Sequence, residues 1–173
     1  LFAIRSAVKV SPNFMPQIRS FVMNGKLEGA QQLCLQENVP VARLISKGLS
    51  RIGRPLDDIN TAIENSGRLE VYQLEKNISI LATISGVAPM LGFLGTVIGM
   101  ILSIFEISNA GGNIDMQLLA DGLYTAMTTT VAGLIVGIVG YICYNHLVVK
   151  TNKAVYQMEA SSLEFLDLLN EPA

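Results

Sequence analysis

The sequence predicts an all-α, multi-pass membrane protein. The mean hydropathy of the 173-residue chain is +0.44 and only 15% of its residues are charged, a composition too apolar for an ordinary soluble domain. Two uncharged runs, 77–105 and 122–149, each exceed the roughly 20 residues that a helix needs to cross a bilayer. The alternative, two core helices of a soluble protein, is disfavoured because such helices rarely run so far without a charge. We therefore expect a transmembrane hairpin.

The distribution of cations predicts how this hairpin is oriented. All 12 Lys and Arg residues lie outside 77–149, whereas the segment 106–121 carries only acids. The positive-inside rule then places both chain ends in the cytoplasm and 106–121 outside it. Lys76 and Lys150 flank the two spans at their cytoplasmic ends, where long side chains can reach the headgroups.

The segments on either side of the hairpin are predicted to be cytoplasmic helices. Apolar residues recur at helical spacing along 5–76, with breaks at Asn24-Gly25 and before Pro40. A helix should begin near Pro55 or Leu56 and continue into the first span. Residues 150–173 likewise continue the second span, with one apolar face. We expect long transmembrane helices that extend into the cytoplasm.

Several classes of function are disfavoured. The net charge of −2 and the lack of a basic run argue against a nucleic-acid partner. Cys34 and Cys143 are too far apart in the sequence to form a metal-binding or redox motif. His146 has no second histidine or cysteine nearby and lies close to Lys150, so an interfacial position is favoured over proton handling. We expect no enzyme activity, no metal and no cofactor.

Small residues recur along one face of each span. Transmembrane helices associate through such residues, because burying leucine against leucine gains little in lipid. The GxxxG pairs Gly95–Gly99 and Gly133–Gly137 are weak signals alone. The residues expected on the two stripes are Ser85, Ala88 or Pro89, Gly92, Thr96, Gly99 and Ser103 in the first span, and Ala126, Thr130, Gly133, Gly137 and Gly140 in the second.

The threonines on these stripes admit two interpretations. In the first, the stripes are packing seams and the hydroxyls bond back to carbonyls of their own helix. In the second, Thr96 and Thr130 face a shared interior, where a hydroxyl can hold a water or a carboxylic acid without carrying charge. Thr128, Thr129 and Thr130 point about 100° apart, so they cannot all line one path.

Two motifs carry a resemblance to a known family. "APMLGFLGTVIGMI" (88–101) and "TAMTTTVAGLIVGIVGYICYN" (125–145) resemble the signature regions of the MotA/TolQ/ExbB proton-channel family, closest to its ExbB and TolQ members. The resemblance implies a bacterial inner-membrane protein, assembled as a pentamer around a central pore. Its implied partners are a single-span, ExbD-like protein with an essential aspartate and a TonB-like protein, and the coupling ion is the proton. The family's two pore threonines correspond to Thr96 and Thr130.

Two departures from the family pattern matter. ExbB-like proteins have a further, N-terminal transmembrane helix, so residues 1–4 are expected to be its stub. Many members carry a glutamate where this chain has Thr125, which puts a proton relay through this subunit in doubt. A MotA-like stator subunit is disfavoured because it has more spans, whereas a TolQ-like role and a structural scaffold that moves no ions remain alternatives.

The spans themselves lack a proton carrier. No Asp, Glu, Lys or Arg lies in 77–105 or 122–149, although protonation chemistry inside a membrane needs a titratable group. We therefore expect a partner's carboxylate to carry the proton, while Thr96 and Thr130 hydrogen-bond to it. Ser103, Thr129 and Thr125 are weaker candidates for the same path. The acids that flank the spans, Glu106 and Asp121, are candidates for gathering cations at the outer mouth.

Overall fold

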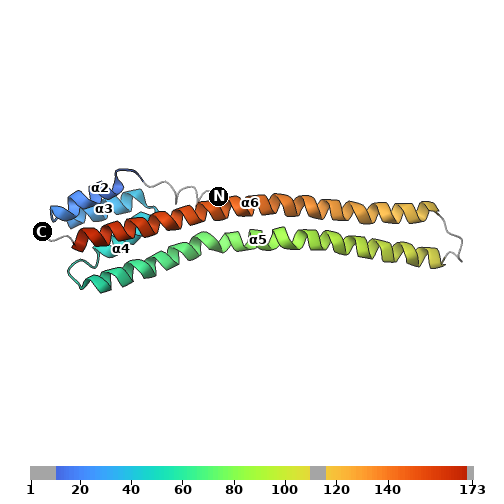
Figure 1. The fold of residues 1–173 in the computed structure, drawn as a ribbon, viewed down its shortest axis with the longest axis horizontal. Coiled ribbons are helices and arrows are strands. Elements are labelled where there is room, and N and C mark those ends of the chain that lie inside the picture. Colours follow the sequence, from blue (N-terminus) through green and yellow to red (C-terminus); the bar gives the residue numbers. More distant parts are fainter. Residues whose placement is uncertain (1–10, 110–115, 171–173) are drawn as a thin grey trace. The chain divides into compact units, whose positions relative to one another are not determined.

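The part of the chain that the structure describes is all-helical, as predicted. The structure is a computed structural model that describes residues 11–109 and 116–170. Its elements in those ranges are α2 (Phe14–Met23), α3 (Leu27–Glu37), α4 (Pro40–Leu49), α5 (Leu56–Asn109) and α6 (Met116–Asn170), shown in Figure 1. The predicted stub at residues 1–4 lies outside the described residues. So does the middle of the predicted segment 106–121, since α5 continues to Asn109 and α6 begins at Met116.

The helices begin and end at residues with identifiable physical roles. Gly25 follows α2 with φ +70°, a left-handed conformation that glycine adopts without steric cost. Asn38 ends α3 in the left-handed region, and Pro40 opens α4, where its missing N–H costs nothing. Helix α5 begins at Leu56 and has Asp57 and Asp58 in its first turn. Their negative charges interact favourably with the positive N-terminal end of the helix dipole. The structure confirms the predicted helix breaks near Gly25 and before Pro40, and the predicted start of a long helix near Leu56.

The chain divides into two compact units. The bundle unit comprises the described residues up to Asn77 together with those from Leu147 onward, and the hairpin unit comprises Ile78–His146. Helices α5 and α6 each contribute one part to both units. The boundaries between the units lie close to the start of the uncharged run 77–105 and to the end of the uncharged run 122–149.

The bundle unit has a conventional hydrophobic core. Phe14 and Ile18 of α2, Ile45 of α4, Ile63 of α5 and Phe165 of α6 are each at most 2% exposed. Burying a side chain of this size stabilises the fold by about 1.5–3 kcal/mol. Ala30 and Cys34 of α3 belong to the same cluster, so the core joins the three short helices to parts of both long ones.

An ion pair fastens α4 to α5 at the edge of this core. The Arg43 guanidinium donates to both carboxylate oxygens of Glu70, from Nε over 2.7 Å and from Nη2 over 2.6 Å. Arg43 also donates to the backbone carbonyl of Asn38 over 3.0 Å. The hydrogen bond to Glu70 raises the pKa of the Arg43 guanidinium. Because Glu70 is only 8% exposed, this pairing satisfies a carboxylate that would otherwise be buried alone.

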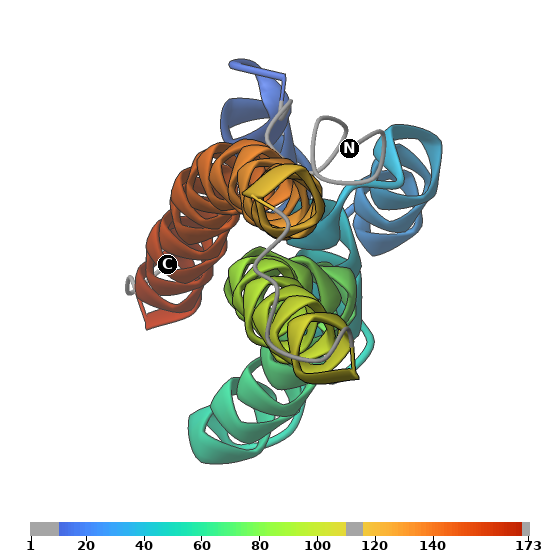
Figure 2. The same ribbon diagram turned by 90° about the vertical axis from the view of Figure 1, so that its right-hand side faces the viewer.

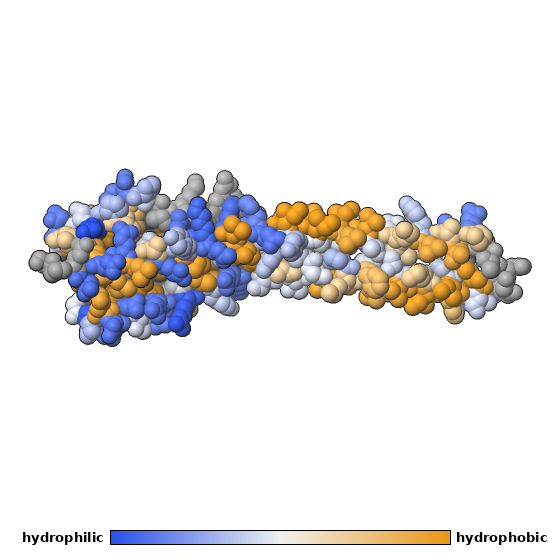
Figure 3. Space-filling view, in the orientation of Figure 1, coloured by the Kyte–Doolittle hydropathy of each residue, from blue (hydrophilic) through white to orange (hydrophobic). Residues whose placement is uncertain are grey.

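The hairpin unit is a pair of antiparallel helices with an apolar outer surface. Its parts of α5 and α6 lie side by side in Figures 1 and 2. The most apolar 18-residue windows of the two helices have mean hydropathies of 2.1 and 1.8, yet only 11% and 17% of these windows is buried. Figure 3 shows the resulting orange surface. Both helices are long and apolar enough to cross a membrane, and their exposure argues against the alternative of soluble core helices.

Candidate helix-packing and ion-path site

The closest approach between α5 and α6 lies at two facing glycines. A Cβ atom at Gly133 would lie 2.7 Å from the carbonyl oxygen of Ala88 and 2.9 Å from the Cα atom of Gly92. A Cβ atom at Gly92 would in turn lie 3.1 Å from the Cα atom of Thr130. These neighbours are backbone atoms, which cannot turn aside as a side chain can. Only glycine therefore fits at position 133 without moving the helices apart.

Further small residues continue this contact toward both ends of the hairpin. We call the whole contact the seam. A Cβ atom at Gly99 would lie 2.7 Å from the Cβ of Ala126, and one at Gly137 would lie 2.5 Å from the Cγ of Pro89. The structure thus brings together residues from the small-residue stripes of the two spans. The remaining seam contacts pair Gly95 with Thr129, Ser103 with Gly122 and Ser85 with Gly140.

One backbone carbonyl collects hydrogen bonds from both helices. The Thr130 hydroxyl on α6 donates to the carbonyl oxygen of Gly92 on α5 over 3.0 Å. Thr129 donates to the Ala126 carbonyl over 2.7 Å, and its hydroxyl is 3.5 Å from the same Gly92 oxygen. In a regular α-helix the Gly92 carbonyl also accepts the N–H of Thr96. The Thr130 hydroxyl therefore contacts α5 one turn from Thr96.

Thr96 itself bonds to its own helix. Its hydroxyl donates to the Phe93 carbonyl oxygen over 2.6 Å, and the residue is half-buried within the single chain. This is the geometry that the packing interpretation of the threonines predicts. A hydroxyl that donates in this way still has lone pairs with which to accept a hydrogen bond. Thr96 can therefore accept from a protonated carboxylic acid without losing its own bond.

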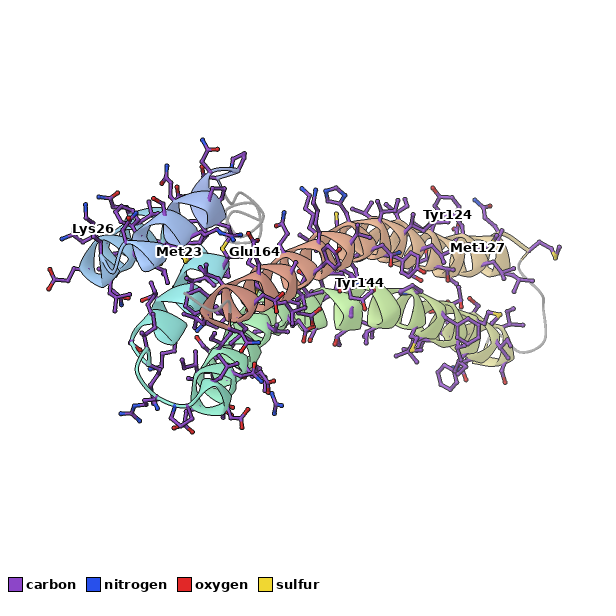
Figure 4. The ribbon with its side chains drawn as sticks, turned by 60° about the vertical axis from the view of Figure 1, so that its left-hand side comes forward. Met23, Lys26, Tyr124, Met127, Tyr144 and Glu164 are labelled. Carbon is purple, nitrogen blue, oxygen red and sulfur yellow. The ribbon has the colours of Figure 1, made fainter. Side chains whose placement is uncertain are left out.

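The other candidate hydroxyls occupy different surroundings. Ser103 is only 3% exposed and donates to the Gly99 carbonyl over 2.9 Å, so it is enclosed within the helix pair. Thr125 is exposed and donates to the Asp121 carbonyl over 2.9 Å. Tyr124, labelled in Figure 4, is 74% exposed on the same part of α6. The structure thus places Thr130 and Ser103 within the seam and Thr125 on an open surface.

Three features of the seam were not identified from the sequence. The Gly92 carbonyl is an acceptor for a threonine of the other helix, which no residue pattern reveals. Pro89 lies inside α5 and packs on Gly137 instead of ending the helix. Gly122 packs on Ser103, and its position four residues before Ala126 could have extended the predicted stripe by one turn.

The described part of the seam contains no titratable side chain. Among the described residues of the hairpin unit, Glu106 and Asp121 are exposed near the ends of α5 and α6, and His146 is exposed at the boundary with the bundle unit. No group of three His, Cys, Asp or Glu side chains that could hold a metal ion is found in the part of the chain that the structure describes. The seam can therefore donate and accept hydrogen bonds but cannot itself take up a proton near neutral pH.

These observations define an α-helical membrane protein whose paired helices approach closely at glycines and carry hydroxyls, but no acid, between them. The chain belongs to the MotA/TolQ/ExbB proton channel family, whose model matches residues 36–160. That range contains both long apolar runs and every seam residue. Members of this family are transport components and not enzymes, as the sequence analysis expected.

Individual relatives are consistent with this assignment. A biopolymer transport protein ExbB homologue of Methanothermobacter thermautotrophicus is 31% identical over 156 residues, covering 87% of this chain. The biopolymer transport protein ExbB of Aquifex aeolicus is 38% identical over 112 residues, which is 63% of this chain and 74% of that protein. The Tol-Pal system protein TolQ of Haemophilus influenzae is 31% identical over 105 residues, or 60% of this chain and 45% of that protein. The match to the Methanothermobacter protein spans only 54% of its length.

Proposed function

We propose that the chain is the channel-forming subunit of an ExbB-like motor in the inner membrane, driven by the proton-motive force. In this proposal it forms a pentamer around a single-span, ExbD-like partner and energises TonB-dependent transport across the outer membrane. Family membership and the names of the relatives support this function. The observation that carries the mechanism is a helix seam rich in hydroxyls that has no acid of its own.

The proton carrier in this mechanism is a carboxylate of the partner. A carboxylate in a low-dielectric interior is costly unless hydrogen bonds or protonation relieve its charge. Thr96 can accept from the protonated acid, and a rotated hydroxyl can donate to the ionised one. Thr130, which contacts the next turn of α5, holds the helix that carries Thr96 in position. Threonine hydroxyls thus serve both protonation states without adding charge.

The exposed apolar surface of the hairpin unit supports its placement in lipid. Side chains such as Met90, Phe93 and Ile104 are 70%, 66% and 65% exposed on α5. Surface of this kind must be covered by acyl chains or by other helices. In the proposed orientation, the bundle unit lies in the cytoplasm and 106–121 faces the periplasm, in agreement with the positive-inside rule.

Two other functions each have an observation in their favour. The similarity to a TolQ protein favours the corresponding subunit of a Tol-Pal system. The bonding of Thr96 to its own helix favours a structural scaffold, because a packing seam needs no more than this. The scaffold differs from the proposal in a measurable way, since it needs neither a proton gradient nor an acidic partner.

Purification from native membranes tests the proposal. We expect the chain to co-purify with a single-span protein that has one intramembrane Asp, and we expect transport by the intact cells to stop when an uncoupler discharges the proton gradient. A complex that lacks any such protein, with transport unaffected by the uncoupler, would support the scaffold instead. A partner that belongs to a Tol-Pal system would indicate the TolQ-like role.

A further inference from the structure

The bundle unit contains an open groove between α5 and α6. The groove has a volume of about 720 Å³, and Leu44 of α4 contributes to its lining. Figure 3 shows apolar side chains lying between hydrophilic ones over this part of the two helices. All of its lining residues belong to the bundle unit, so the groove is separate from the seam.

The groove is lined by one regular stripe from each long helix. On α5 the lining positions run from Asn60 to Glu75 in alternating steps of three and one residues, and on α6 they run from Val155 to Leu166 in the same steps. This spacing is that of a single helix face. At 1.5 Å per residue the stripes are about 22 Å and 17 Å long. Two parallel stripes of this length match a third helix of about three to four turns.

The centre of the groove allows a helix to approach closely. Gly67 lies midway along the α5 stripe, and the nearest side-chain atom to a Cβ built there is the Leu44 Cδ2, at 3.5 Å. Ser162 takes the corresponding central place on α6. Apolar side chains flank both small residues, among them Val71 and Met158. A helix bound in the groove would therefore bury its apolar face against these apolar side chains.

The charges along the groove are mainly acidic. Glu64, Glu75 and Glu159 line it, against the single cation Arg68. All four side chains are exposed. Within the described residues, no ion pair or side-chain hydrogen bond engages Glu75 or Glu159. A helix whose apolar face is bordered by Lys or Arg would complement both the apolar lining and these three glutamates, which we call the acidic rim.

We propose that this groove binds a basic amphipathic helix in the cytoplasmic flank of the single-span partner, an inference that rests on the proposed function. The positive-inside rule enriches that flank in Lys and Arg. The flank also has to lie near the membrane, and Glu75, the last groove residue on α5, comes two residues before the uncharged run that begins at Asn77. The groove would thus hold the cytoplasmic end of the partner.

A second copy of this chain fits the groove less well. Of its short described helices, α2 and α4 each bury much of their apolar face in their own core. Helix α3 carries Glu28 and Glu37 and no cation between Leu27 and its last residue, so an acidic groove would repel it. The charge of the rim therefore favours a different polypeptide as the occupant.

Photocrosslinking in the assembled complex tests this inference. A photoreactive benzoylphenylalanine would replace Tyr72, an aromatic residue that lines the groove and is 65% exposed, and the crosslinked peptide would be identified by mass spectrometry. We expect the peptide to come from the Lys- and Arg-rich cytoplasmic flank of the single-span partner. A peptide from a second copy of this chain, or no crosslinked peptide, would overturn the inference.

Matched variants of exposed residues separate groove binding from loss of folding. Leu163 lines the groove and is 63% exposed, whereas Leu69 lies outside it and is 66% exposed. We expect Leu163→Asp to lower the crosslink yield about tenfold, because the apolar stripe of the partner would meet a charge, and Leu69→Asp to leave it unchanged. Equal yields in both variants would contradict the inference.

Charge reversal provides a second comparison on α6. Glu159→Lys should lower the yield several-fold, whereas Glu164→Lys, at an exposed position outside the groove (Figure 4), should not. Equal effects of the two reversals would contradict the role of the acidic rim. If the partner is absent even from wild-type membranes, the proposed function fails as well. If it co-purifies and its intramembrane Asp is required but the probe at position 72 crosslinks elsewhere, only the groove inference fails.

Discussion

Replacing Thr96 by valine is expected to abolish proton-driven transport while the complex stays assembled. Valine has nearly the shape of threonine but cannot bond to a carboxylic acid. The hydroxyl of Thr96 bonds only to its own helix, at the Phe93 carbonyl, so its removal breaks no contact between α5 and α6. We expect transport to fall roughly 100-fold or more, the effect typical of a group that assists proton transfer.

Thr83→Val provides the matched control for this substitution. Thr83 lies on the same helix and donates over 3.1 Å to the carbonyl oxygen of Ser79, four residues earlier. Thr83 is exposed, however, and does not belong to the small-residue stripe that contains Thr96. We expect normal transport in this variant. Transport would be measured in cells, and assembly by the mass of the purified complex. Full activity of Thr96→Val in an intact complex would rule out the proposed role of its hydroxyl.

Replacing Gly133 by alanine is expected to separate the two helices of the hairpin. The new Cβ would lie 2.7 Å from the Ala88 carbonyl oxygen and 2.9 Å from the Gly92 Cα, and neither atom can move without shifting the backbone. Overpacking of this kind typically costs about 1–3 kcal/mol. The Thr130 hydroxyl would also lose its bond to the Gly92 carbonyl as the helices part. We therefore expect a lower melting temperature in detergent and a lower yield of the complex.

Gly86→Ala is the control for the Gly133 substitution. Gly86 also lies in the apolar run of α5, but a Cβ atom built there meets nothing within 4 Å. Alanine favours helix by up to about 1 kcal/mol relative to glycine, so stability should stay the same or rise. Equal melting temperatures for Gly133→Ala and the wild type would show that the close approach at position 133 is not needed.

Much of the helical pattern could be predicted because it depends on local chemistry. The helix breaks at Gly25 and Pro40 and the helix start at Leu56 follow from the backbone preferences of glycine and proline, which act within one or two residues. The small-residue stripes follow from helical periodicity alone. Which stripe residues meet depends on how far one helix is shifted along the other, and that shift is fixed by contacts such as Pro89 on Gly137.

Long-range partnerships were not accessible in this way. Arg43 and Glu70 are 27 residues apart, and no spacing rule links them. The acceptor of the Thr130 hydroxyl is a backbone carbonyl, which carries no sequence signature. The groove likewise depends on the alignment of two helix faces whose residues are about 90 positions apart in the sequence. The ion pair, the interhelical hydrogen bond and the groove each form only when folding brings distant segments of the chain together.

The most direct test of the proposed mechanism is proton flux in liposomes that contain the purified chain with or without its single-span partner. A pH-sensitive dye inside the vesicles would report flux after a membrane potential is imposed. The mechanism predicts flux only when both proteins are present, and loss of that flux when the partner's intramembrane Asp is replaced by Asn. Equal flux through vesicles that contain this chain alone would contradict the claim that the partner supplies the proton-carrying group.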